Sequence, residues 1–458
     1  MRGTMSLGVC LWIGSIQATA GGEAEAAAGA QAATAPAAGW TSYKPSDPLN
    51  RQLPRWLKLS GEARLRFEGR TAFGYKPGDD DYYGLSRLRI NVDLRPAHWV
   101  QLFAQGQDSR VVRMDTRRVG PLFKDTLDVR QAYLYLGNTE SWPAAVRLGR
   151  QDLLFGAQRL VGPLDWTNTA RSFDALRLEL VGKKARADIF AASVVRLDPT
   201  VFDKRRDGEN FHGIYSAFTS LLPLTVIEPY LFFKTNPRVL GERRASGSLG
   251  RYTAGYRIAS RPGVKQLHGL DYSAEFARQW GHLASDEISA WAGYGILGYT
   301  AGRLPWSPRF NAEYSYATGD PNPGDGSAGT FDNLYPTNHL FYGLADLIGW
   351  QNIRNPRVGI DVKPHKKMKV SFDHHWFALA DRHDHLYAAG LGIGVRTPAG
   401  GARHTDIGRE LDAAWWYTVS PQWIFGAGCG RLFPGKYLKE NSPGSSTTFP
   451  YVFMTYRM

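Results

Sequence analysis

Arginine recurs at alternate positions in two neighbouring stretches of the chain. Arg64 and Arg66 belong to the first stretch, and Arg87 and Arg89 belong to the second. A guanidinium group keeps its positive charge at physiological pH and donates paired hydrogen bonds to a carboxylate or a phosphate. Several such groups on one surface would attract and orient anions, or they would form cross-strand charge ladders with nearby carboxylates. The further charged residues that we assign to this surface are Glu62, Asp93, Arg177 and Glu179.

The spacing of these residues indicates the element that carries them. Between residues 57 and 70, the odd positions are apolar or small and the even positions are polar or charged. A period of two places the two sets on opposite faces of a β-strand. Strands with one apolar face and one heavily charged face are typical of a sheet that separates lipid from water. The same alternation recurs in residues 87–95, 176–180, 251–258, 270–277, 309–316 and 410–419.

The connections between these stretches alternate between short and long. Short periplasmic turns and long extracellular loops are typical of outer-membrane barrels, which have an even number of strands. We therefore predict that residues 51–458 form an all-β fold, a transmembrane antiparallel β-barrel of about 18 strands. Residues 127–136 and 185–235 are expected to contribute strands although their alternation is unclear. A soluble β-propeller is disfavoured because the sequence has no repeat of blade length.

The start of the chain indicates export. Residues 1–20 contain Arg2, an apolar stretch at residues 7–16 and Ala18-Thr19-Ala20, which is the layout of a signal peptide. Residues 21–50 are rich in Ala, Gly and Pro and are predicted to be a flexible periplasmic segment. Cys429 would be the only cysteine of the mature chain, which excludes an intrachain disulfide. We expect insertion by the barrel assembly machinery into the bacterial outer membrane, in contact with membrane lipid and lipopolysaccharide.

The overall charge limits the class of partner. The 458-residue chain has a formal net charge of +13, which suits nucleic acid, an anionic membrane surface or an anionic solute. Because the alternation places many charges on the inner wall of a barrel, we expect an anionic solute and no nucleic acid partner. Trp415, Trp416, Tyr417 and Trp423 flank a tight turn and are predicted to form part of the aromatic girdle at a membrane interface.

Few other residues have the spacing of a chemical site. Asp320 and Asp325 are candidate oxygen ligands for Ca²⁺, but a solvated turn cluster is the simpler interpretation because their spacing matches no recognised calcium loop. His374 and His375 are adjacent and point to opposite faces of a strand, so they would not chelate one ion together. We expect no resident metal or cofactor. No Ser-His-Asp arrangement stands out, so the sequence does not favour an enzyme.

Five motifs together suggest a family. They are Leu148-Gly-Arg-Gln151, Leu164-Asp-Trp-Thr-Asn-Thr-Ala-Arg171, Leu334-Tyr-Pro-Thr337, Trp350-Gln-Asn-Ile-Arg354 and Gly408-Arg-Glu-Leu-Asp412. With them, the sequence resembles the alginate-export family of outer-membrane porins over residues 57–458. The resemblance implies an 18-stranded monomeric barrel whose basic lumen passes a polyuronate out of the cell. It also implies a constriction of arginines with partnering carboxylates, for which Arg150, Arg171 and Arg354 are the matching residues.

Several functions therefore stay open. The first is a pore with a basic lumen that passes anionic polysaccharide or oligosaccharide, with alginate-like export and periplasmic polysaccharide-export proteins as partners implied by the resemblance. The alternative is a general or anion-selective uptake porin. A barrel enzyme and a structural barrel with a plugged lumen are further possibilities. Residues 319–353 and 380–406 are long enough to fold into the barrel and to gate it.

Overall fold

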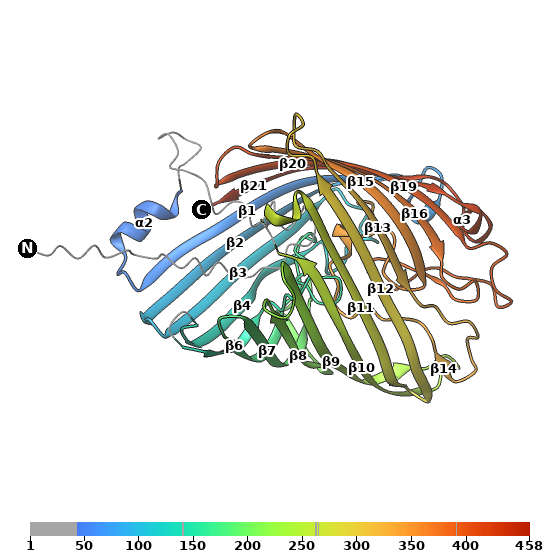
Figure 1. The fold of residues 1–458 in the computed structure, drawn as a ribbon, viewed down its shortest axis with the longest axis horizontal. Helices are drawn as coiled ribbons and strands as arrows, with labels where there is room; N and C mark the ends of the chain where they lie inside the picture. The colour runs from blue at the N-terminus through green and yellow to red at the C-terminus, as the bar shows by residue number, and fades with distance from the viewer. Residues whose placement is uncertain (1–43, 140–141, 262, 264, 391) are drawn as a thin grey trace, which may run out of the picture.

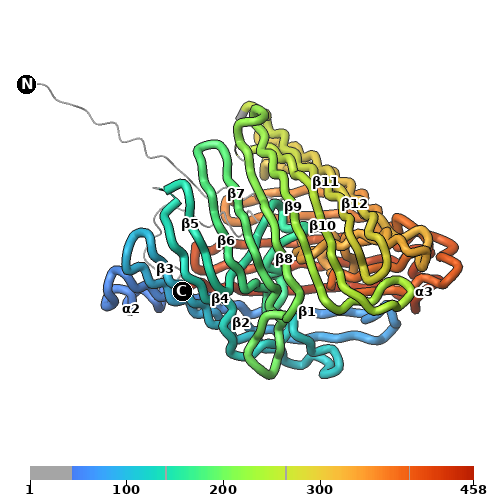
Figure 2. The backbone as a smooth tube through the Cα atoms, turned by 90° about the horizontal axis from the view of Figure 1, so that it is seen from below, coloured from blue at the N-terminus to red at the C-terminus, as the bar shows by residue number. Residues whose placement is uncertain are grey.

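The computed structural model describes residues 44–139, 142–261, 263, 265–390 and 392–458. Eighteen long antiparallel strands form one closed barrel (Figure 1). β1 (Leu57–Arg70) closes it by pairing with β2 (Asp81–Ala97) on one side and β21 (Thr447–Arg457) on the other. The blue β1 accordingly runs beside the red C-terminal strands (Figure 2). The predicted fold class is confirmed, whereas the predicted signal peptide at residues 1–20 lies outside the described residues.

The barrel strands follow one another around the wall in chain order. The remaining ones are β3 (Val100–Val112), β4 (Asp125–Gly137), β5 (Ala144–Gln151), β6 (Phe173–Val181), β7 (Ala185–Arg196), β8 (Lys204–Phe218), β9 (Thr225–Leu240), β10 (Ser246–Ser260), β11 (Leu270–Leu283), β12 (Asp286–Thr300), β13 (Arg309–Ala317), β15 (Ile353–His365), β16 (Met368–Leu379), β19 (Asp406–Thr418) and β20 (Trp423–Pro434). The short β14 (Ser327–Ala328) pairs in parallel with β12, and β17 (Leu386–Tyr387) pairs with β18 (Ile393–Val395). β13 therefore pairs directly with β15.

The alternation of apolar and charged residues separates the two faces of the barrel wall. Phe67, Ile90 and Phe310 are 63%, 54% and 50% exposed on the outer face. Arg64 and Glu313, on the opposite parity of their strands, are buried inside the barrel. Exposed apolar side chains around the outside are suited to the hydrocarbon of a bilayer, while the interior keeps the polar groups.

Two short helices lie at the barrel ends. α2 (Ser46–Gln52) is tied to β1 through Asn50, whose side-chain amide donates to the Leu59 carbonyl at 2.8 Å and accepts from the Leu59 amide at 2.7 Å. The segment predicted to be flexible over residues 21–50 therefore ends in a helix, and its residues before 44 lie outside the described part. α3 (Lys436–Asn441) follows β20. No helix in the described residues is long and apolar enough to cross a membrane.

Two connections fold into the barrel. We call residues 152–172, between β5 and β6, the first inward segment, and residues 329–352, between β13 and β15, the second inward segment. They are hydrogen-bonded to each other: the Tyr335 amide donates to the Leu160 carbonyl at 2.8 Å, and the Thr337 amide donates to the Gln158 carbonyl at 2.9 Å. Both segments contact residues on the inner faces of opposite walls, so they cross the lumen.

Part of the inner face of β6 to β9 is apolar, beside charged residues such as Arg177 and Asp188, which explains the unclear alternation in residues 185–235. Phe173, Phe190, Phe211 and Phe232 point inward and are buried. The Phe211 ring lies 5.0 Å from the ring of Tyr335 in the second inward segment. These strands face protein on the inside and lipid on the outside, so both of their faces are apolar. In β4, a register shift against β3 between Gln105 and Gly106 interrupts the period of two.

Candidate functional site in the lumen

The inner face of β1 and β2 carries Arg64, Arg66, Arg87 and Arg89, which we call the arginine cluster. All four are buried, and they surround residues 165–167 of the first inward segment. Arg87 Nη1 and Arg89 Nη2 lie 3.2 and 2.7 Å from Asp165 Oδ1. Arg87 Nη2 is also 2.7 Å from Glu62 Oε1. The cluster therefore holds the segment through one shared carboxylate.

Backbone carbonyl groups accept the other hydrogen bonds of the cluster. Arg64 donates to the carbonyls of Asp165 and Thr167 at 3.0 and 2.7 Å, and Arg66 donates to that of Trp166 at 2.5 Å. The Arg66 guanidinium also stacks over the Trp166 ring, 4.1 Å from its centroid. Among the described residues, Arg64 has no carboxylate within ion-pair distance, and its direct hydrogen bonds go to backbone carbonyl groups.

A cavity of about 60 Å³ that opens to solvent lies between the inward segments and the wall formed by β11 to β19. Glu313 lines it and pairs with Arg159 at 2.7 Å and with Arg357 at 2.8 Å. The Arg159 guanidinium lies between the rings of Tyr294 and Phe341, 3.8 and 3.9 Å from their centroids. Cations and carboxylates alternate on this wall, so the cavity is of mixed charge and differs from the arginine cluster.

The second inward segment is held by polar contacts at two places. Its Leu344 and Ala345 amides donate to Asp412 Oδ2 at 3.2 Å and to Glu410 Oε1 at 2.8 Å, both on the inner face of β19. Asp332, near its start, pairs with Lys234 at 3.0 Å and with Arg251. Burial raises the pKa of the Asp332 carboxyl, but the two cations lower it by more, so its pKa falls to about 2. The carboxylate is therefore charged at neutral pH.

The other charged residues predicted for the lumen wall form local pairs. Arg177 Nη2 lies 2.7 Å from Asp188, and Glu179 Oε1 lies 3.2 Å from Arg147, all on inner faces. Asp93 pairs with Arg95 at 3.1 Å near the turn between β2 and β3. The Arg177–Asp188 and Arg147–Glu179 pairs are cross-strand charge ladders, whereas the Asp93–Arg95 pair lies within β2. Arg171, in the first inward segment, donates to the carbonyls of Gly162 and Pro336 at 3.1 and 3.2 Å and so links the two segments.

Arg150 and Arg354 are not on the lumen wall, contrary to the sequence prediction. Arg150 shares the outer face of β5 with Leu148, which is 54% exposed, and its Nε lies 2.8 Å from Asp174 Oδ1. Arg354 shares the outer face of β15 with Val358, which is 47% exposed, and it donates to the Leu379 carbonyl at 3.1 Å. The inward arginine of β15 is Arg357. The sequence signal for the outer face is the apolar residue at an even spacing along the same strand, Leu148 for Arg150 and Val358 for Arg354.

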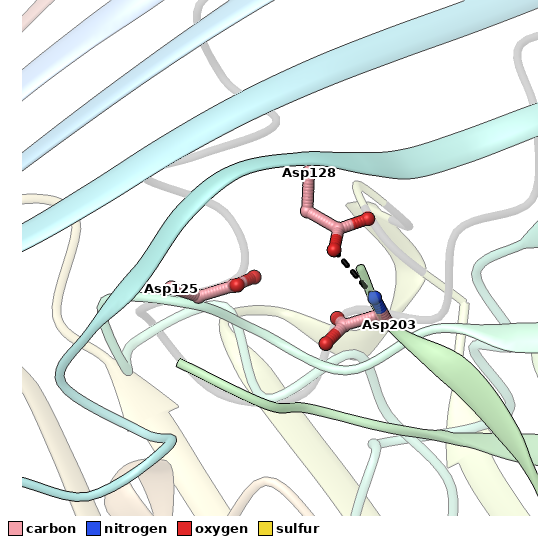
Figure 3. A group of neighbouring side chains, drawn as sticks. All are labelled: Asp125, Asp128 and Asp203. Carbon is pink, nitrogen blue, oxygen red and sulfur yellow. Dashed lines mark hydrogen bonds between the residues drawn. The ribbon is translucent and has the colours of Figure 1, made fainter. Parts of the chain in front are cut away.

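The two weak candidates for Ca²⁺ ligands, Asp320 and Asp325, make hydrogen bonds within turns. Asp320 Oδ1 accepts from the Asn322 amide at 2.9 Å and Asp325 Oδ1 from the Ser327 amide at 2.8 Å, as in ordinary turns. Neither belongs to the group of three candidate ligands in the described residues, which is Asp125, Asp128 and Asp203 (Figure 3).

One oxygen of each of these three aspartates lies within 4.8 Å of the others. The Asp203 amide donates to Asp128 Oδ2 at 2.6 Å. Burial raises the pKa of Asp203 to about 6, with a further contribution from the Asp128 carboxylate. Sequence spacing did not indicate this group because Asp203 is remote in the chain from the other two.

A closed barrel of 18 strands with an apolar outer face and a charged interior defines an outer-membrane porin. Residues 55–452 match the family model described as alginate export, and the chain belongs to this family. Its place in the bacterial outer membrane and the resemblance inferred from the sequence are thereby confirmed. No curated protein matches the sequence.

Solved structures from Pseudomonas aeruginosa have a similar fold. OpdQ is 9% identical with a TM-score of 0.61, covering 88% of this chain and 98% of its own. OccK5 (OpdH) is 10% identical with a TM-score of 0.59, covering 88% and 98%. The outer membrane protein opdK is 12% identical with a TM-score of 0.57, covering 88% and 99%. At these identities the likeness concerns the fold alone.

Proposed function

We propose that this porin is a passive, loop-constricted channel for small anionic solutes of the carboxylate-bearing saccharide class. The observation that carries the proposal is the arginine cluster, in which Arg87 and Arg89 share the Asp165 carboxylate while Arg64, among the described residues, has no carboxylate partner. The Asp165 side chain is 48% exposed while the guanidinium groups behind it are buried, so a solute carboxylate would reach them by displacing Asp165. A cationic site between low-dielectric walls raises the local concentration of anions.

The geometry suggests how an anion would pass. Asp165 occupies the position that a solute carboxylate would take between Arg87 and Arg89. A solute would exchange with it, so the arginines would never lose all of their partners during transit. Such an exchange keeps the binding weak enough for release, which conduction requires. The contacts of Arg64 and Arg66 with backbone carbonyls would meanwhile keep the first inward segment in place.

Ion selectivity in planar bilayers tests this proposal. Under a salt gradient, the native channel is expected to show an anion-selective reversal potential, and R64Q is expected to shift it towards zero. The side-chain amide introduced by R64Q can still donate a hydrogen bond to a backbone carbonyl, so the segment is retained while the charge is removed. R110Q is the matched control, because Arg110 is an exposed arginine paired with Asp108 on β3. Cation selectivity of the native channel would contradict the proposal.

A second measurement concerns the exchange itself. Short oligouronates should block the current by residing at the arginine cluster. D165N removes the competing carboxylate and should increase the affinity of the block by about tenfold, the effect of one charged hydrogen bond. A weaker block in D165N would mean that Asp165 positions the arginines for the solute and does not compete with it.

Passage of an alginate-type polymer is the second candidate, and membership of the alginate export family favours it. A polymer chain would require the inward segments to leave the lumen, because they lie across it in the structure. A length series of uronate oligomers separates the two candidates. For a small-solute channel, the longer oligomers block without crossing, whereas a polymer conduit gives crossing events whose duration increases with oligomer length.

A further inference from the structure

The lipid-facing surface of β19 and β20 carries two arginines, Arg409 and Arg431, near the outer ends of these strands. Both are exposed. In the strand register, Trp376 of β16 lies opposite Arg409, and Leu411 lies between His374 and Arg431 on the neighbouring strands. Arg409 is thus a diagonal neighbour of Arg431 on one outward face.

These two arginines differ from the other outward arginines in their partners. Arg110 pairs with Asp108 at 2.8 Å, and Arg150 pairs with Asp174 at 2.8 Å. Within the described part of the chain, neither Arg409 nor Arg431 has an ion pair or a side-chain hydrogen bond. Aromatic rings lie beside them instead: the Arg431 guanidinium is 5.2 Å from the Phe433 ring, and the Trp376 ring, opposite Arg409 in the register, is 3.9 Å from that of His374. Their guanidinium groups are therefore free to pair with an anion from outside the chain.

The level of the two arginines in the membrane indicates which part of the bilayer could supply that anion. Tyr417 on β19 and Trp423 on β20 are aromatic residues at the periplasmic ends of these strands. Arg409 and Arg431 are each separated from them by about eight residues along the strand, which is roughly 27 Å, or roughly 20 Å of height at a tilt of about 40°. The apolar band of such barrels is about 25 Å tall. The backbone of the two arginines therefore lies about 5 Å below the upper edge of the band. Their long side chains span this distance to the outer-leaflet headgroups.

We propose that Arg409 and Arg431 bind the phosphate groups of a phosphorylated glycolipid of the outer leaflet, of the lipopolysaccharide type. Guanidinium forks match phosphate oxygens bidentately, and they bind them strongly at a membrane surface. Trp376 and Phe433 supply flat apolar surfaces on which the sugar and the first acyl carbons of the lipid can rest. The site lies on the outside of the barrel and does not depend on what passes through the lumen.

Binding of purified lipid A to the full-length barrel in detergent tests the proposal. Native mass spectrometry with bisphosphorylated lipid A and with its dephosphorylated form gives the affinity ratio. The native barrel is expected to prefer the bisphosphorylated form by at least about tenfold, and R409Q/R431Q to lose this preference. R110Q is the control, since its arginine is already paired, and it should keep the preference. Equal preference in R409Q/R431Q and the native barrel would overturn the proposal.

Two further arms make the result specific. R409K/R431K keeps the charge without the fork and should retain part of the preference, which separates loss of charge from a folding defect. Inorganic phosphate, added at millimolar concentration without lipid, should neither bind measurably nor displace lipid A. Displacement by inorganic phosphate at that concentration would show a free-anion site and would overturn the assignment to a lipid. Conductance is expected to be unchanged in all of these variants.

Discussion

The two sides of the lumen hold the inward segments by different means. On β1 and β2, arginines hold residues 165–167 through hydrogen bonds to carbonyls and through the Asp165 carboxylate. On β6 to β9, the rings of Phe173, Phe211 and Phe232 pack against the segments through apolar contacts. A solute anion can replace a polar contact, whereas an apolar contact has no such competitor. The difference indicates a fixed apolar wall and an exchangeable polar wall, with solute passing on the polar side.

Removing the second inward segment should have the largest effect, because both walls then lose one of the segments that they hold. Replacing residues 330–350 by a short Gly/Ser link takes away Tyr335, Trp350 and the other groups that lie across the lumen. We expect single-channel conductance to rise several-fold, because the widest obstruction is gone, and current noise to increase. Shortening the external connection at residues 241–245 is the control and should leave conductance nearly unchanged. Unaltered conductance after removal of the segment would place the constriction elsewhere.

Truncating an aromatic side chain of the apolar wall should have the next largest effect, on the stability of the barrel. Phe211→Ala leaves a cavity among Phe190, Phe232 and Tyr335, whose rings lie 5.0 to 5.3 Å from that of Phe211. We expect a loss of about 3–5 kcal/mol in the free energy of unfolding, the usual effect of Phe→Ala in a packed core. Equilibrium denaturation in lipid vesicles measures it.

Phe372→Ala is the matched control, because Phe372 is half exposed on the lipid face of β16. A loss in Phe211→Ala no larger than in Phe372→Ala would mean that the second inward segment does not stabilise the wall.

The contrast between the polar and the apolar wall also explains which features of the structure the sequence predicts. In residues 57–70 and 87–95, lipid lies outside and polar groups lie inside, so a period of two predicted both the strands and the inward arginines. In β7 to β9 the inner partners are the two inward segments, through Phe155 and Tyr335, and no local pattern reveals them. Family motifs identified Arg150 and Arg354 but carried no information about their faces. Asp203 joins Asp125 and Asp128 only through the fold.

Acid should weaken the ion pairs that Asp332 of the second inward segment forms with Lys234 and Arg251. The pKa of Asp332 is lowered to about 2 by Lys234 and Arg251, against the opposing effect of burial. A carboxyl whose pKa is lower in the folded state stabilises the fold above its unfolded value of 3.8 and loses that contribution as the pH falls towards 2. We expect channel noise to increase between about pH 4 and 2.

D332N should be noisy at every pH and should lack this step. D325N, in the external turn, is the control and should retain the native pH profile. A noise profile in D332N that still changes over this acid range would assign the step to another carboxyl.

The smallest expected effect compares two arginines of one strand. Arg357 faces the cavity and pairs with Glu313 at 2.8 Å, while Arg354 faces outward and donates to the Leu379 carbonyl. R357Q leaves Glu313 with only Arg159, so the lumen gains one uncompensated negative charge and the reversal potential should move towards cation selectivity. R354Q changes a charge outside the lumen and should leave the reversal potential within error of the native value. Equal shifts in the two variants would mean that the field of the barrel exterior sets selectivity, and the face of an arginine would then not matter.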